Sequence, residues 1–231
     1  MTFSAPALHW ILFALQAASF HHARWSPDGR SILIATHNES LNYLYELSTR
    51  RLRSLTVSEV RELERNWAPP ASRRPRLIER RSANGQDVFI EIRGGADWRK
   101  LNQETWAEQP SFSPRGDLVA YEAREDPHAV LTSFVVVVDT SGDQRRRMTQ
   151  GTDPSWSPDG SKILFKTPSQ GELHIATVDV RGSALRILGS GVHPAWSPDG
   201  SRIAYMVERS GRSNIWVMRA DGSDKQCLTC R

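Results

Sequence analysis

Five polar side chains recur at one fixed place in this sequence, and their types are those of metal ligands and acid–base groups. Each lies three residues before the aromatic residue that opens a repeated phrase, and together they are His22, Glu64, Gln109, Asp153 and His193. Imidazoles and carboxylates could bind a cation or transfer protons if the fold brought them together. Whether they meet depends on the repeated elements that carry them.

The repeated phrase occurs five times. Three copies read WSPDG and begin at Trp25, Trp156 and Trp196; a fourth reads FSPRG from Phe112, and a divergent fifth reads WAPPA from Trp67. The opening residues are separated by 42, 45, 44 and 40 positions. A period of this length is typical of supersecondary units that stack around or along an axis.

The SPDG part of the phrase predicts a tight turn. Proline presets φ, aspartate accepts hydrogen bonds from its own backbone, and glycine tolerates a positive φ. The chain should therefore reverse direction there, between two strands. The turn-forming residues are Asp28 and Gly29, Asp159 and Gly160, and Asp199 and Gly200. This role explains their recurrence, so we do not assign these carboxylates to catalysis.

Strand-like segments fill the rest of each repeat. An apolar run follows each well-formed turn, at 32–34, 118–121, 163–165 and 203–206. Because these runs do not alternate with polar residues, both faces of the strand should be covered by neighbours. A second β-branched or aromatic strand and a more polar strand complete the repeat. Four antiparallel strands in about forty residues predict an all-β fold, a β-propeller of about five blades.

The expected organisation is an N-terminal apolar segment, 1–20, followed by one propeller domain, 21–231. The repeats should cover 22–60, 61–105, 106–150, 151–189 and 190–231. The first segment should form a packed strand or a short helix. A secretory signal peptide is the alternative, although Arg24 is the first basic residue and such signals begin with positive charge. Its apolar stretch is too short to span a membrane.

The WSPDG phrase, the apolar strand, the aromatic strand, the DG turn and an LT ending together resemble the TolB-type repeat, over roughly residues 20–229. The resemblance implies a noncatalytic scaffold that binds a protein or peptide, and it favours a location outside the cytoplasm. Family propellers usually have six or more blades. A six-bladed or open arrangement, self-association of an open ring, and a fragment of a larger propeller therefore remain alternatives to a closed ring of five.

In a propeller, the first strand of each blade lines the central channel, so the five recurring polar residues would form a ring near one mouth. We expect a wet, polar wall that a protein segment could bind. The alternative is a small enzyme, a metal-assisted hydrolase or lactonase-like protein, that uses the ring. The sequence contains no GxSxG, Gly-rich phosphate loop, HExxH or EF-hand loop, so we expect no enzyme and no metal or other cofactor.

Positive charge is concentrated around the second repeat. The chain has a net charge of +4 and a pI near 9.4. A divergent, solvated blade is the favoured interpretation, and docking of an acidic protein, phosphate or lipid headgroups is the alternative. Few aromatic residues interleave with these arginines, so we do not expect nucleic acid to stack there. The patch comprises Arg73, Arg74, Arg76, Arg80 and Arg81.

Two further local patterns lead to predictions. Thr56 and Glu59 have capping-box spacing, and apolar residues follow at helical intervals, so 56–66 should be a helix. Cys227 and Cys230 form at most half of a zinc site. We expect two unreactive thiols, with a local disulfide as the alternative outside the cytoplasm.

Overall fold

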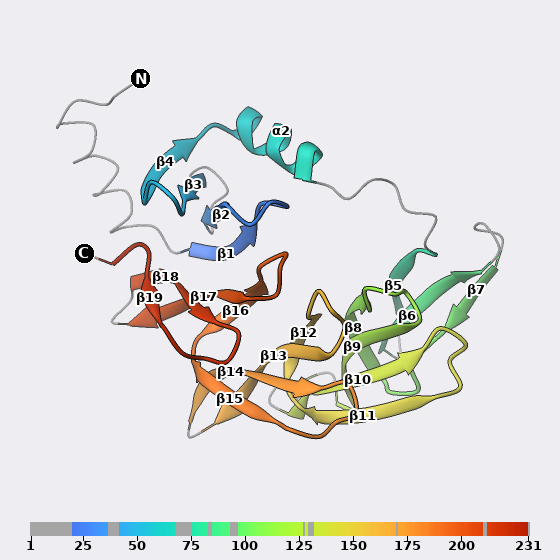
Figure 1. Ribbon diagram of the computed structural model, residues 1–231. Coiled ribbons are helices and arrows are strands. Elements are labelled where there is room, and N and C mark those ends of the chain that lie inside the picture. The colour runs from blue at the N-terminus through green and yellow to red at the C-terminus, as the bar shows by residue number, and fades with distance from the viewer. Residues whose placement is uncertain are drawn as a thin grey trace. The chain divides into compact units, whose positions relative to one another are not determined.

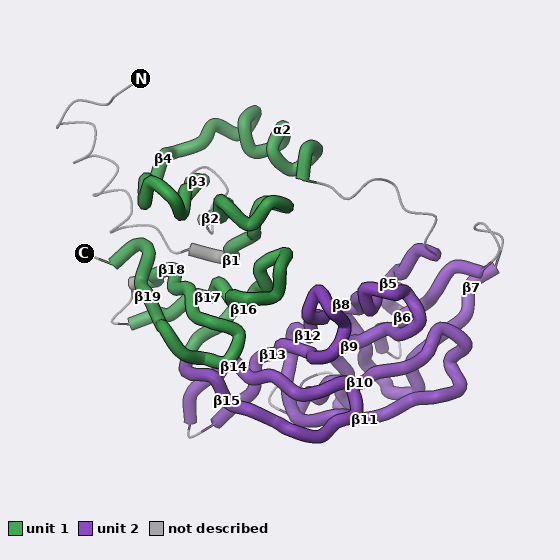
Figure 2. The backbone as a smooth tube through the Cα atoms, viewed as in Figure 1, with its two compact units in different colours: residues 1–70, 191–231 green, residues 71–190 purple. Residues whose placement is uncertain are grey.

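A computed structural model describes residues 20–36, 42–67, 75–82, 85–92, 97–126, 128, 132–169, 171–209 and 212–230. The predicted N-terminal segment lies almost entirely outside these residues. Strands predominate, and the backbone contacts divide the chain into two compact units, 1–70 with 191–231 and 71–190, shown in Figure 2.

Among its described residues, the first unit contains two four-stranded antiparallel sheets and helix α2 (Val57–Trp67), which Figure 1 shows. Each sheet follows chain order, as expected for a repeat that folds as a meander. The first sheet comprises β1 (Phe20–Trp25), β2 (Ser31–Thr36), β3 (Asn42–Glu46) and β4 (Arg51–Leu55), and the second comprises β16 (Val192–Trp196), β17 (Arg202–Arg209), β18 (Arg212–Arg219) and β19 (Gln226–Cys227).

The second unit contains the other repeats. One sheet has four antiparallel strands in chain order, β12 (Thr152–Trp156), β13 (Lys162–Ser169), β14 (Glu172–Asp179) and β15 (Arg186–Ser190). A seven-stranded sheet contains β8 (Trp106–Phe112), β9 (Leu118–Arg124), β10 (Phe134–Asp139) and β11 (Arg145–Gln150), together with β5 (Leu77–Ser82), β6 (Gly85–Ile92) and β7 (Asp97–Lys100). The all-β fold with repeated antiparallel sheets is thus confirmed.

The second repeat departs from the expected four strands. It contributes only β5, β6 and β7 among the described residues, and β6 joins β8 through a single parallel pair, Gln86 with Trp106. Where a first strand was expected, the chain forms helix α2 (Val57–Trp67). Trp67, the one residue of that phrase that the structure describes, therefore ends a helix rather than a first strand.

Helix α2 confirms the predicted capping box. The Glu59 carboxylate accepts a hydrogen bond from the Thr56 backbone N–H at 2.8 Å, and the Glu59 N–H donates to the Thr56 hydroxyl at 3.3 Å. Because the helix is fixed at this end, Val60, Leu63 and Trp67 pack against Leu33, Leu44 and Leu55 of the first sheet. The opposite face of that sheet, with Ile32 and Ile34, packs in a core with Ile215 and Val217 of the last sheet.

The SPDG turns have the predicted structure. In the first copy, the Gly29 N–H donates to the Ser26 carbonyl at 2.9 Å, and Asp28 accepts hydrogen bonds from the Ser26 hydroxyl and the Arg30 N–H. Gly29 has φ 69°, a left-handed conformation that glycine adopts without strain. The same bonds recur around Asp159 and Asp199.

These turns predict sensitivity to acid. Hydrogen bonds from the Ser157 hydroxyl and then the Ser161 N–H lower the pKa of Asp159 from 3.8 to about 2, and the equivalent bonds lower the pKa of Asp199 to about 2. A carboxyl whose pKa is lower in the folded state stabilises it above its unfolded pKa, and that contribution is lost as pH falls through the folded value. We therefore expect the free energy of unfolding to decrease between about pH 4 and pH 2.

Urea unfolding at a series of pH values measures this effect. Asp159→Asn should unfold with a weaker dependence on pH across that interval, since one of the titrating groups is gone. An unchanged dependence in the variant would show that the turn carboxylates do not contribute to acid stability.

Candidate functional site

Three of the five recurring polar residues share an unusual backbone conformation. Gln109, Asp153 and His193 have φ values of 54°, 52° and 51°, in the left-handed region that non-glycine residues seldom adopt. Each lies where the pairing of the first strand of its repeat with the next strand shifts register. A β-bulge therefore sets the direction of the chain at each of these positions.

The other two residues differ. Glu64 lies on helix α2 rather than on a first strand, so it is not equivalent to the rest. His22 pairs with Ala35 in β1, next to a register shift of the same kind. His22, Glu64 and His193 belong to the first unit, whereas Gln109 and Asp153 belong to the second. Polar contacts connect the surroundings of these last two residues.

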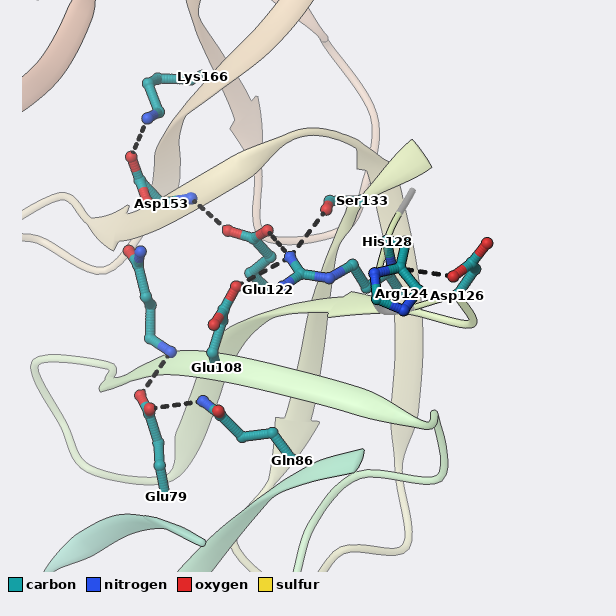
Figure 3. Close-up of polar contacts among 11 residues, drawn as sticks. Glu79, Gln86, Glu108, Glu122, Arg124, Asp126, His128, Ser133, Asp153 and Lys166 are labelled. Carbon is teal, nitrogen blue, oxygen red and sulfur yellow. Dashed lines mark hydrogen bonds and ion pairs between the residues drawn. The ribbon is translucent and has the colours of Figure 1, made fainter. Parts of the chain in front are cut away.

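The centre of these contacts is a largely buried ion-pair group on β8 and β9, next to Ser133 just before β10. Figure 3 shows Arg124 between two carboxylates, with its guanidinium 2.8 Å from Glu108 Oε1 and 2.9 Å from Glu122 Oε1. The Ser133 hydroxyl lies 3.5 Å from the same nitrogen. The side chains of Arg124 and Glu122 are 7% and 4% exposed, whereas that of Glu108 is 23% exposed.

Asp153 extends the group onto the neighbouring repeat. Its backbone N–H donates to Glu122 Oε2 at 3.3 Å, and its carboxylate forms an ion pair with Lys166 of β13. The left-handed bulge turns this N–H toward the buried carboxylate. This hydrogen bond therefore connects the bulge to the buried ion pairs.

Gln109 makes the equivalent connection to the second repeat. Its backbone N–H donates to Glu79 Oε1 of β5 at 2.7 Å, and the other oxygen of Glu79 accepts a hydrogen bond from the Gln86 side chain at 2.8 Å. We call the whole set the inner-strand polar network. It comprises Glu79, Gln86, Glu108, Gln109, Glu122, Arg124, Ser133, Asp153 and Lys166.

Negative charge exceeds positive charge in the inner-strand polar network. Four carboxylates, those of Glu79, Glu108, Glu122 and Asp153, face two cations, Arg124 and Lys166. Burial raises the pKa of Glu122, and the charges of Glu108 and Asp153 add to this effect. A further cation near Glu79 and Glu108 would therefore be electrostatically favoured.

Sequence reasoning found Gln109 and Asp153 but missed the groups that bind them. The recurring position does not include Glu108, Glu122, Arg124 or Lys166, so repeat alignment alone does not identify them. One signal was available: Glu122 and Arg124 stand two residues apart at the end of an apolar strand, where side chains two apart share a face.

Several aromatic rings lie beside the arginines of the predicted basic patch, although the local sequence contains few aromatic residues. The Arg80 guanidinium lies 5.1 Å from the centre of the Phe89 ring and 5.5 Å from that of Trp98, and Arg76 also lies 5.5 Å from Trp98. Arg81 stacks on Trp106 at 5.1 Å. These rings come from neighbouring strands, which the sequence alone does not place beside the arginines. Arg73 and Arg74 lie outside the described residues.

The two cysteines form a disulfide between Cys227 and Cys230, so the expectation of free thiols was wrong. Within the described part of the chain, no cluster of three or more histidine, cysteine or acidic side chains has metal-binding geometry. Among the same residues, no helix has the length and apolar character needed to cross a membrane.

Repeated four-stranded sheets, SPDG turns and first-strand bulges define the class of this protein as a β-propeller. The family model of the TolB beta propeller domain matches residues 16–190 and 149–231, and the chain belongs to this family. No curated protein matches it in sequence.

Solved structures agree with this assignment at the level of the fold. The chain is similar to a putative TolB from Agrobacterium tumefaciens, with a TM-score of 0.58 and 18% identity, over 91% of this chain and 80% of that one. It is similar to TolB from Acinetobacter baumannii, with a TM-score of 0.56 and 16% identity, over 90% of this chain and 53% of that one.

An oligogalacturonate lyase in complex with manganese is similar as well, with a TM-score of 0.51 and 14% identity, over 90% of this chain and 64% of that one. This chain thus spans about half of the Acinetobacter protein and just under two thirds of the lyase. At these identities the likeness shows a shared fold, which both TolB proteins and an enzyme use.

Proposed function

We propose that this protein is a noncatalytic binding module that recognises a cationic segment of another protein at the inner-strand polar network. The observation that carries the proposal is the surplus of carboxylates over cations in the network. The surplus persists when Arg81, which stacks on Trp106 nearby, is counted as a third cation. A lysine or arginine side chain of a partner would complete the ion pairing.

The network is suited to binding because its charges are held in place before a partner arrives. Glu108 is fixed by Arg124, and Glu79 is fixed by hydrogen bonds from Gln109 and Gln86. Glu79 is exposed and Glu108 is partly exposed, so both carboxylates can be reached from solvent. Preorganised charges lose less entropy on binding than flexible ones.

The resemblance to TolB proteins supports a protein partner. The Cys227–Cys230 disulfide supports a location in an oxidising compartment, where such bonds persist. Arg124 and Lys166 support a binding rather than a catalytic role for the network, because they already pair with three of its four carboxylates.

Peptide binding tests the proposal. A labelled peptide of alternating lysine and alanine should bind to the wild-type chain at low salt, as followed by fluorescence anisotropy. The double variant Glu79→Gln/Glu108→Gln should bind it about tenfold more weakly, which corresponds to roughly 1.4 kcal/mol. Asp143→Asn is the matched control, since it removes a carboxylate from the exposed turn at the opposite end of β10.

Two results would contradict the proposal. Equal binding of a peptide of alternating glutamate and alanine would mean that the network does not select for positive charge. An oligogalacturonate lyase in complex with manganese has a similar fold. Turnover of oligogalacturonate in the presence of manganese, abolished by Glu122→Gln, would assign the network to catalysis instead.

A further inference from the structure

A separate cavity lies within the first unit, whereas the inner-strand polar network belongs to the second. Its volume is about 230 Å³, and arginine side chains are prominent in its lining. It is formed by the turn between β3 and β4 and by strands β17, β18 and β19 of the last sheet. The lining residues are Tyr45, Leu47, Arg50, Arg202, Val217, Met218, Arg219, Asp224, Gln226 and Leu228.

Two of the arginines lie directly opposite each other in the last sheet, where their like charges do not stabilise the fold. Arg202 begins β17 and Arg219 ends β18, and they are directly opposite each other in the antiparallel register. Like charges at directly opposed positions destabilise a sheet. No carboxylate among the described residues forms an ion pair with Arg202, so its charge is uncompensated.

The third arginine reaches the cavity from a different element. Arg50 is the last residue of the turn between β3 and β4 and has φ 54°, a left-handed conformation. It too has no carboxylate within ion-pair distance among the described residues. Three exposed arginines from three segments therefore line one small space.

The cavity has a net charge of about +2 because only one carboxylate offsets the three arginines. That carboxylate is Asp224, whose oxygen lies 3.8 Å from Arg219 Nε at a largely exposed position. Asp224 also accepts a hydrogen bond from the Gln226 amide at 3.0 Å. Burial raises the pKa of Tyr45, so its phenol remains neutral at physiological pH and can donate a hydrogen bond.

The remaining lining is apolar and well fixed. Val217 and Met218 are buried on β18, and Leu228 is held by the hydrogen bond from its N–H to the Ile215 carbonyl at 2.8 Å. The Cys227–Cys230 disulfide closes the chain around Leu228. A ligand that fills the cavity must therefore combine a strongly charged group with a small apolar body.

We propose that this cavity binds a small phosphate monoester. A phosphate monoester carries about −1.5 to −2 charge at neutral pH, which matches the net charge of the lining. Guanidinium groups donate paired hydrogen bonds to phosphate oxygens, which makes arginine well suited to this group. A single carboxylate would leave about one positive charge unpaired. The volume is below the range of about 300–1,000 Å³ that is typical of drug-sized ligands, so the body of the ester must be small.

Phenyl phosphate is a suitable probe, because it joins a phosphate to one aromatic ring. Titration of the full chain, followed by isothermal calorimetry and by the shift in thermal unfolding temperature, should show saturable binding. Inorganic phosphate should bind more weakly because it lacks the apolar body, and benzoate should bind at least tenfold more weakly because it carries a single charge.

Arg202→Gln should weaken phenyl phosphate binding at least tenfold. The matched control is Arg209→Gln, which removes the same charge from the far end of the same strand, outside the cavity. In the absence of ligand, Arg202→Gln should leave the unfolding temperature unchanged or raised, because it relieves the opposed arginine pair. If Arg202 served only to stabilise the fold, Arg202→Gln would lower the unfolding temperature in the absence of ligand.

The inference fails if phenyl phosphate does not bind, if benzoate binds equally well, or if the two variants weaken binding by the same factor. It does not rest on the proposed function. The cavity and the inner-strand polar network lie in different units and bind opposite charges, so either result can stand without the other.

Discussion

Replacing Arg124 by alanine should reduce the free energy of unfolding by about 3–5 kcal/mol, the usual effect of removing one partner of a buried ion pair. Arg124 pairs with both Glu108 and Glu122, and Glu122 is only 4% exposed. Without the guanidinium, the Glu122 carboxylate would be buried and would lose the ion pair that it forms among the described residues. Urea denaturation followed by circular dichroism measures the loss.

The pH dependence of this variant gives an independent test. Burial already raises the pKa of Glu122 in the wild-type chain, and the loss of Arg124 should raise it further. A carboxyl whose pKa is higher in the folded state binds more protons there, so stability falls as pH rises. Arg124→Ala should therefore be less destabilising at pH 5 than at pH 8, by an amount on the order of 1 kcal/mol.

A double variant separates lost charge pairing from lost packing. Arg124→Met/Glu122→Gln removes the buried charges but keeps similar volumes, and such replacements are often close to neutral. It should be clearly more stable than Arg124→Ala. If both variants were equally unstable at every pH, packing of the Arg124 side chain on Trp106, rather than compensation of Glu122, would explain the loss.

The sequence predicted the parts of this fold that depend on local chemistry. The turns at Asp28, Asp159 and Asp199 form because proline, aspartate and glycine fix the backbone within a few residues. Helix α2 was also predicted, since the Thr56–Glu59 capping box is a local signal. Both patterns act over short stretches of chain, where sequence is most informative.

The first strand that was expected before Trp67 is replaced by helix α2, for a physical reason. The repeat spacing predicts a divergent copy of the repeated phrase at Trp67, because an aromatic residue stands at the expected position. The preceding capping box fixes a helix there, and the helix ends at Trp67, which packs on the first sheet. The capping box predicts a helix at this place, whereas the repeat spacing predicts a first strand. The chain forms the helix.

The candidate site was predicted only in outline. Alignment of the repeats selected Gln109 and Asp153, which share a bulge and a left-handed backbone. Their partners Glu79 and Glu122 lie on other strands, 30 and 31 residues away in sequence. These contacts depend on how the strands of neighbouring repeats pack, which periodicity does not specify.

Replacing Trp25 by alanine should also cost about 3–5 kcal/mol, the range found for buried large aromatic residues. Trp25 is 7% exposed and lies in the core between the first and last sheets of the first unit. Its indole N–H donates to the Ala195 carbonyl at 3.1 Å, across 170 residues of sequence. Loss of this side chain removes both apolar contacts and a hydrogen bond between distant parts of the chain.

Two further substitutions separate the contributions to this loss of stability. Trp25→Phe keeps most of the ring but removes the donor, so it should cost only about 0.5–1.5 kcal/mol for the hydrogen bond, plus a smaller packing loss. Trp196→Ala is the comparison within the same sheets, since Trp196 is less buried. It should be less destabilising than Trp25→Ala. Equal losses of stability would contradict this explanation. They would mean that each repeated tryptophan stabilises the fold to the same extent, whether or not it joins the first and last sheets.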